Sequence, residues 1–144
     1  MTAQGDPVPR EHDILRLPKP PKDFMPEGNR PSTQEYVPST ADKEDAERNH
    51  HPVRISVWDA TVTSVEDALA FRSGPALVLR SAVGAVLDAG ASAVVYEPLP
   101  VPDCERPGAA GHAGIEGVPR APDETRPAHR DRLAAIAACF RLVV

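Results

Sequence analysis

The sequence predicts a small single α/β domain, a three-stranded sheet covered by helices, preceded by a long disordered or partner-ordered arm. This prediction rests on the uneven distribution of proline and apolar residues along the chain. Residues 1–52 hold nine of the 17 prolines and 12 apolar residues, whereas residues 53–144 hold 47 apolar residues. A chain of 144 residues holds one ordinary domain but not two packed ones. We therefore place the compact domain in residues 53–144.

The first 52 residues are predicted to be a Pro-rich, charged arm that is dispensable for folding. Such a composition buries too little apolar surface to offset the entropy that is lost on ordering. Only a short polar helix, over residues 41–49, is compatible with it. The apolar side chains of the arm come in short clusters, which is typical of segments that dock on a partner. The predicted partner-binding anchors are Leu15, Leu17, Phe24 and Tyr36.

The domain is predicted to begin with a strand and a short helix. Residues 53–58 alternate between apolar and polar side chains, the period of a half-buried strand. Ser64 can cap the amide of Asp67, so we expect a helix over residues 65–72. The strand alternation leaves Trp58, the single tryptophan, on the second face of the sheet. There it is either covered by a helix or, if it is exposed, an interface anchor, and we add it to the partner-binding residues.

Residues 75–90 allow two interpretations. One is a buried strand over 76–79 followed by a helix over 82–89 that Ser81 caps, and the other is a single helix over the whole segment. We favour the first, because the apolar run is short and a good cap residue follows it. A third strand is predicted over 93–97, which is rich in β-branched and aromatic residues.

The remaining residues are predicted to form a long loop and a helix. Residues 98–127 hold seven prolines together with glycines, too many for regular structure. The helix begins near Pro127 and continues toward the end of the chain. Leu133, Ile136 and Phe140 share one face of it, and this face is expected to cover the sheet.

The segment from Gly108 to Gly117 supports an enzymatic alternative, a small hydrolase or transferase. In that interpretation His112 is a general base that Glu116 or Asp103 orients, or Cys104 is the nucleophile. The other interpretation is a flexible loop in which the glycines form turns. We prefer the flexible loop. The favoured prediction of function therefore includes no catalytic residue.

Composition excludes several further classes of function. The net charge of -5 argues against nucleic-acid binding, which needs a cluster of basic side chains. We expect no membrane span, because no apolar run approaches the required length. The opening residues lack the pattern of a secretory signal, so we expect a cytoplasmic protein with reduced Cys104 and Cys139. No metal-ligand spacing, phosphate loop or dinucleotide motif is present, and we expect neither metal nor cofactor.

These observations together predict a non-enzymatic interaction protein. The excess of Arg over Lys, with abundant Ala, Pro and Gly, is typical of GC-rich bacterial coding sequences. We therefore expect a bacterial adaptor, immunity or assembly factor. Its small domain and its arm are expected to bind a larger protein partner.

Overall fold

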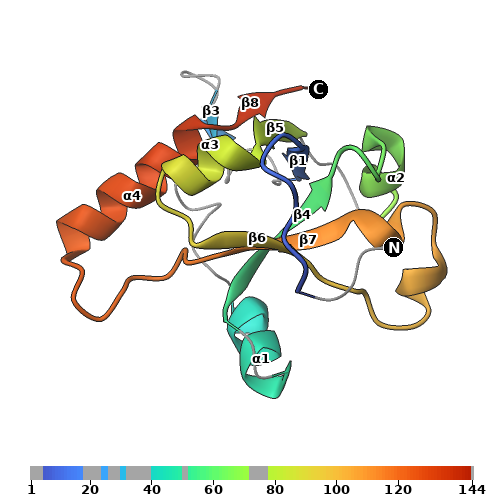
Figure 1. Cartoon of the computed structure of the whole chain (residues 1–144), viewed down its shortest axis with the longest axis horizontal. Helices are drawn as coiled ribbons and strands as arrows, with labels where there is room; N and C mark the ends of the chain where they lie inside the picture. Colours follow the sequence, from blue (N-terminus) through green and yellow to red (C-terminus); the bar gives the residue numbers. More distant parts are fainter. Residues whose placement is uncertain are drawn as a thin grey trace.

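The computed structural model describes residues 5–17, 24–25, 30–31, 40–49, 52–71 and 78–143. In chain order the elements are β1 (Asp13–Arg16), β2 (Phe24–Met25), β3 (Arg30–Pro31), α1 (Thr40–Asn49), β4 (Arg54–Asp59), α2 (Val65–Leu69), β5 (Leu79–Ala82), α3 (Val83–Asp88), β6 (Ala93–Tyr96), the 3-10 turns η3 (Asp103–Glu105) and η4 (Ala109–Gly111), β7 (His112–Glu116), α4 (Arg126–Ala138) and β8 (Arg141–Leu142). Figure 1 shows α3 and α4 close together, α2 at the opposite end of the molecule and α1 apart from them.

Six strands form one antiparallel sheet in the order β6-β7-β4-β1-β5-β8, and β2 pairs with β3 separately. The predicted three-stranded sheet is therefore wrong. Its three strands exist as β4, β5 and β6, but none of them is a neighbour of another. Strand β7 separates β6 from β4, and β1 separates β4 from β5. The two intervening strands lie in segments whose prolines and glycines predict an arm and a loop.

Strand β1 occupies the middle of the sheet. It pairs antiparallel with β4, where Leu15 lies opposite Trp58, and antiparallel with β5, where Leu15 lies opposite Arg80. Strands β4 and β5 therefore run parallel to each other, and α2 lies in their connection. Ile14 and Leu15 point to opposite faces of the sheet, and both are completely buried.

Residues 5–8 extend this N-terminal contribution along the edge of β6. The Gly5 amide donates to the Tyr96 carbonyl at 2.9 Å, and the Val8 amide donates to the Val94 carbonyl at 2.8 Å. The expectation of an arm preceding the fold is therefore wrong for residues 5–17. One strand needs only a few apolar residues, so a composition averaged over 52 residues conceals it. Most of the chain between β1 and α1 lies outside the described residues.

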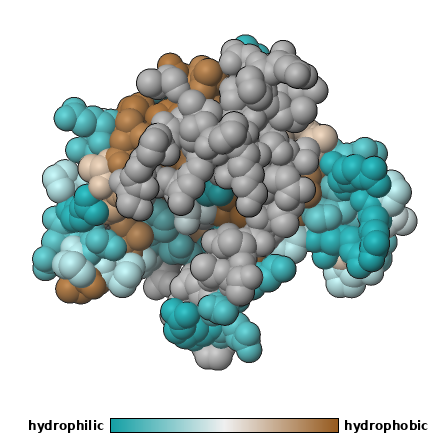
Figure 2. All heavy atoms as spheres, turned by 180° about the vertical axis from the view of Figure 1, so that it is seen from behind, coloured by the Kyte–Doolittle hydropathy of each residue, from teal (hydrophilic) through white to brown (hydrophobic). Residues whose placement is uncertain are grey.

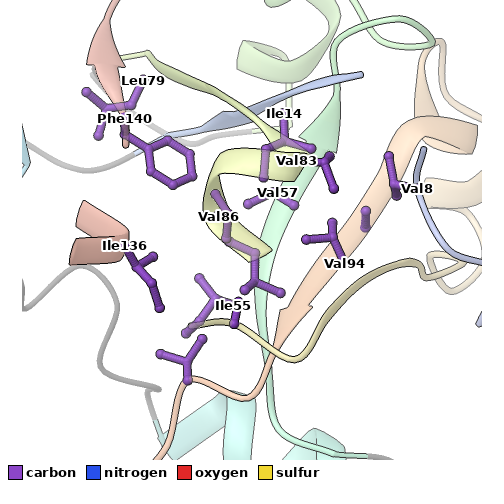
Figure 3. Close-up of a cluster of buried hydrophobic side chains, with 14 of the residues drawn as sticks. Val8, Ile14, Ile55, Val57, Leu79, Val83, Val86, Val94, Ile136 and Phe140 are labelled. Carbon is purple, nitrogen blue, oxygen red and sulfur yellow. The ribbon is translucent and has the colours of Figure 1, made fainter. Parts of the chain in front are cut away.

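The larger core lies between the sheet and the helices α3 and α4. In Figure 3, Val86 of α3 and Ile136 of α4 point toward side chains of the central strands. Its buried apolar side chains are Val8, Ile14, Ile55, Val57, Leu79, Val83, Val86, Ala91, Val94, Tyr96, Ala113, Ile115, Val118, Leu133, Ile136, Ala137 and Phe140. The prediction that the C-terminal helix covers the sheet is confirmed.

Helix α4 is shorter than its apolar spacing predicts. The Thr125 side chain caps it by accepting from the Ala128 amide at 3.2 Å, and Pro127 lies in the first turn as predicted. The helix ends at Ala138, and the chain then turns into β8. Phe140 lies in this turn and is only 2% exposed. Phe140 therefore belongs to the core although it lies outside the helix.

The two other local predictions are also resolved. A strand followed by a helix, β5 and α3, confirms the order favoured for that segment, but β5 shares only Leu79 with the predicted strand. Ser81 does not cap α3, because its hydroxyl donates to the Ala82 carbonyl at 3.1 Å. The predicted cap of α2 is confirmed, since the Ser64 hydroxyl oxygen accepts from the Asp67 amide at 3.1 Å.

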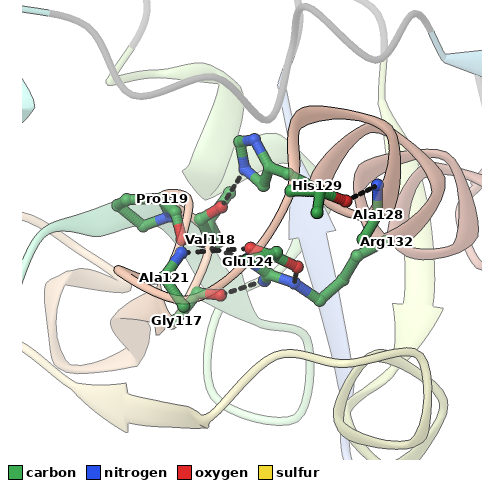
Figure 4. A network of polar contacts seen from close by, with 9 residues as sticks. Gly117, Val118, Pro119, Ala121, Glu124, Ala128, His129 and Arg132 are labelled. Atoms are coloured by element: carbon green, nitrogen blue, oxygen red, sulfur yellow. Dashed lines mark hydrogen bonds and ion pairs between the residues drawn. The ribbon is translucent and has the colours of Figure 1, made fainter.

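An ion pair holds the loop before α4 against that helix (Figure 4). Arg132 donates to both carboxylate oxygens of Glu124, at 2.9 and 2.8 Å, and also to the Gly117 carbonyl. The side chains of Arg132 and Glu124 are only 17% and 15% exposed. Arg132 lowers the pKa of Glu124 to about 2. A bidentate pair of this kind adds a defined geometry to the charge attraction, so it orients the loop relative to α4.

We predict that Glu124→Gln destabilises the protein near neutral pH but has little effect near pH 2. A carboxyl whose pKa is lower in the folded state stabilises the fold above its unfolded pKa of about 4.3. That stabilisation is lost as the pH falls toward about 2. Urea unfolding across this range measures the difference from the unmodified chain. Asp123→Asn, at an exposed neighbour, is the matched control, and equal effects of both variants would contradict the prediction.

We predict that Leu15→Ala lowers the free energy of unfolding by about 2 to 5 kcal/mol, the usual cost of emptying a buried leucine site. Removing residues 1–17 is expected to abolish cooperative unfolding, because it deletes a central strand. Urea titration followed by tryptophan fluorescence measures both effects. The control is Val101→Ala, since Val101 is 78% exposed and its loss should change the stability by less than about 0.5 kcal/mol. Full stability of the shortened chain would show that β1 is not required.

Candidate functional site

The second face of the sheet carries a smaller core beneath α2. Its buried side chains are Leu15, Leu17, Trp58, Ala68 and Val78, and the half-buried side chains packed against them are Ala60, Val65, Leu69, Phe71 and Leu99. We call these five half-buried side chains the α2 patch. Figure 2 shows the molecule from behind, with hydrophobic side chains gathered on the left, the side on which α2 lies in this view.

Trp58 forms the base of the α2 patch. Its ring centroid is 4.5 Å from that of Phe71, with the planes tilted by 30°, and 4.9 Å from that of His112, which it meets edge-on. The alternation of β4 places it on this second face, as predicted. Trp58 is only 7% exposed, however. Phe71 is therefore the more accessible member of the aromatic pair, and Trp58 supports it from below.

Arg106 holds the segment around η3 against α2. Its guanidinium stands over the Phe71 ring, 4.3 Å from the ring centroid, and donates to the Ala70 carbonyl at 2.5 Å. The Asp103 carboxylate lies 3.9 Å from Nη1 of the same guanidinium. A cation held over an aromatic face is attracted by the ring quadrupole. The α2 patch thus carries a positive group in a defined position beside its most accessible aromatic ring.

The glycines between residues 108 and 117 permit close packing. A Cβ at Gly111 would collide with the Thr63 side chain, and a Cβ at Gly114 would lie 2.7 Å from the Cβ of Arg54. These residues form η4 and β7, the strand that joins β4 to β6. The prediction of one long loop over 98–127 is therefore wrong. Glycine is needed here because neighbouring side chains lie directly over the strand.

Arg54 crosses β7 over Gly114 and links three parts of the sheet. Its Nε donates to Glu116 of β7 and its Nη1 donates to Glu97 at the end of β6, both at 2.8 Å. The Arg54 side chain is only 9% exposed. Burial by itself lowers the pKa of Arg54, but the two carboxylates outweigh burial and raise it. The guanidinium is therefore charged, and it acts as a buried crosslink.

Asp59 is a second buried crosslink, on the opposite face at the end of β4. Its carboxylate is completely buried and accepts three hydrogen bonds, from His12 Nδ1 at 2.9 Å, from the Thr61 amide at 2.9 Å and from the Tyr96 hydroxyl. Burial alone raises the pKa of Asp59, but these donors outweigh burial and hold the pKa below its ordinary value. Burial and the neighbouring carboxylate raise the pKa of Tyr96.

The Asp59–His12 pair resembles the orienting half of a catalytic triad. Its bonds, however, connect the N-terminal segment, β4 and β6, which are the parts of the fold that meet at this point. Within the described ranges, no group of three or more His, Cys, Asp or Glu side chains could hold a metal ion. We therefore interpret the pair as a polar crosslink between three segments of the chain.

The residues of the catalytic alternative do not converge. His112 and Glu116 occupy the two ends of β7, and four residue steps along the strand separate their backbones by about 13 Å. His112 Nδ1 donates to the Glu97 carbonyl at 2.9 Å, whereas Glu116 accepts from Arg54. Cys104 is exposed in η3. Glu116 is therefore too distant to orient His112 as a general base.

The predicted partner-binding anchors lie mostly in the interior. Leu15, Leu17 and Trp58 belong together to the smaller core, and none is more than 7% exposed. Their side chains stabilise the fold and are not accessible to a partner. Phe24 lies in β2, whose side chains are outside the description, and Tyr36 lies outside the described residues.

Sequence reasoning missed Phe71, Leu99 and Arg106. Phe71 follows a short helix, and the other two lie in a segment predicted to be a loop. A contact between a ring and a guanidinium from distant parts of the chain leaves no periodic signal. The scarcity of aromatic residues, with three Phe in the whole chain, was the one available indication that Phe71 matters.

No protein-family model, curated protein or solved structure shows significant similarity to this chain. The contacts of its own residues are therefore the basis for a functional conclusion. In the part of the chain that the structure describes, no helix combines the length and the apolar character needed to cross a membrane.

We predict that Tyr96→Phe costs about 1.5 to 3 kcal/mol of stability, the range for hydrogen bonds to charged groups. The substitution leaves the buried Asp59 carboxylate with one donor fewer. Asp59→Asn is expected to be similarly damaging, and the double variant should cost clearly less than the sum of the two. Urea unfolding of the four chains measures this coupling. Strictly additive losses would contradict a direct interaction.

Proposed function

We propose that this protein is a non-enzymatic interaction protein that binds a larger protein partner through the α2 patch. The carrying observation is the half-buried apolar cluster around Phe71, with Arg106 held over the ring. Scattered apolar side chains on a surface need no explanation, but a contiguous apolar cluster is typical of binding sites. Aromatic residues and arginine are also the residue types enriched at interface centres.

Two exposed apolar side chains add to this proposal. Val62, which precedes α2, is 44% exposed, and Val101, which follows Leu99, is 78% exposed. Both lie in the two segments that form the patch. Burial of such side chains against a partner removes apolar surface from water, which favours association.

The enzymatic alternative has less support. Catalysis needs convergent polar groups at one accessible site. The polar groups on the second face, Arg54, Glu97 and Glu116, are instead engaged with one another in a buried network.

A variant of the two exposed valines beside the patch tests the proposed function. The full-length chain, bearing an affinity tag, is expressed in the organism that encodes it and isolated under mild conditions. We expect one larger protein to co-purify in a fixed ratio. The double substitution Val62→Ser and Val101→Ser should reduce its affinity about tenfold, since hot-spot side chains contribute over about 1 kcal/mol each.

The matched control is Ala134→Ser, at an exposed position of α4 on the other face of the sheet. It should leave the affinity unchanged. All three positions are exposed, so the variants are expected to fold normally. Absence of any stoichiometric partner, or equal binding by the valine variant, would reject the proposal.

A further inference from the structure

The charged side chains of the two segments that form the α2 patch are mostly acidic. Residues 60–71 and 99–106 contain four carboxylates and one guanidinium, a formal charge of -3 (one positive minus four negative). The carboxylates are those of Glu66, Asp67, Asp103 and Glu105. Glu66 and Glu105 are exposed. The two segments also lie against each other, because Arg106 donates to the Ala70 carbonyl and stands over the Phe71 ring.

Arg106 does not neutralise this acidic rim. Its guanidinium is engaged with the Ala70 carbonyl, the Phe71 ring and, at 3.9 Å, the Asp103 carboxylate. A positive charge fixed in this way offsets one carboxylate at most. Glu66 and Glu105 therefore leave the exposed margin of the patch negative.

Resting on the function proposed above, we infer that the partner presents an amphipathic segment whose apolar side chains are flanked by Lys or Arg. The apolar side chains of this segment cover Phe71 and Leu99. Its basic side chains face Glu66 and Glu105. Complementary charge of this kind selects the partner and accelerates encounter, while the apolar contacts supply most of the affinity.

The same charges disfavour two other occupants. Nucleic acids and anionic lipid surfaces both present dense negative charge, which an acidic margin repels. An acidic amphipathic segment would meet the same repulsion. The apolar patch and its charges thus select a basic amphipathic segment of a protein.

Two synthetic helical peptides test the inference on the full-length chain. Each has about 14 residues, three to four helical turns, and the same leucine stripe, with Lys at the remaining positions of one and Glu at those of the other. Neither contains Trp, so the single Trp58 beneath Phe71 reports binding at the patch through its fluorescence. We expect the Lys peptide to bind at least tenfold more tightly at low salt. The difference should shrink at about 0.5 M salt, where charges are screened within a few ångströms.

Charge-neutralising variants test whether Glu66 and Glu105 cause the preference for the Lys peptide. The double substitution Glu66→Gln and Glu105→Gln should weaken binding of the Lys peptide about three- to tenfold. The matched control is Glu44→Gln with Glu47→Gln, at two exposed positions of α1 that carry the same charge. That control should leave the affinity unchanged.

The outcomes separate the two proposals. If the Glu peptide binds as tightly as the Lys peptide, or both double variants weaken binding equally, the inferred basic partner is wrong while the α2 patch still binds. If neither peptide changes the Trp58 fluorescence and Val62→Ser with Val101→Ser has no effect on partner capture, the patch is not a docking surface and both proposals fall.

Discussion

The antiparallel insertion of β1 between β4 and β5 is the interaction on which the remaining structure depends. Two parallel strands held apart by a third present unpaired backbone groups to the gap, and buried groups of this kind must be satisfied. Strand β1 forms hydrogen bonds with the backbone groups of both β4 and β5. Its neighbouring residues Ile14 and Leu15 then enter the two different cores, so the same four residues join the sheet laterally and connect its two faces. Residues 5–8 cover the edge of β6 as well, which removes an exposed edge that other strands could join.

The polar interior complements this arrangement. Asp59 and Arg54 are charged and buried, and each bonds to partners from other strands or segments. Desolvation of such groups is unfavourable, and it is tolerated only where hydrogen bonds and opposite charges offset it fully. Both residues meet that condition in the described contacts. Because the fold itself satisfies the hydrogen bonds and charges of these groups, the surface that we propose for binding is the α2 end, where aromatic and aliphatic side chains are half-buried.

The local elements were more predictable than the assembly. Alternation over 53–58, the cap at Ser64 and the apolar face containing Leu133 and Ile136 identify β4, α2 and α4, because those signals lie within one short window. Strands β1 and β7 escaped detection for the opposite reason. Both are short, and proline or glycine dominates their surroundings, although Gly114 is required by Arg54 lying across the strand. The α2 patch escaped as well, since Phe71 and Arg106 meet only after the chain has folded.

The long stretch of sequence between β1 and its neighbour β5 also shapes how the protein reaches its native state during synthesis. Strand β1 ends at Arg16 and its second neighbour, β5, begins at Leu79, so 62 residues are translated between them (78 minus 16). At a translation rate of about 5 to 20 residues per second, β5 is synthesised roughly 3 to 12 s after β1. Ile14 and Leu15 cannot take their native positions between β4 and β5 before then. Pairings between such distant segments make folding slow. The nascent chain therefore keeps Ile14 and Leu15, which are completely buried in the folded protein, exposed throughout this interval.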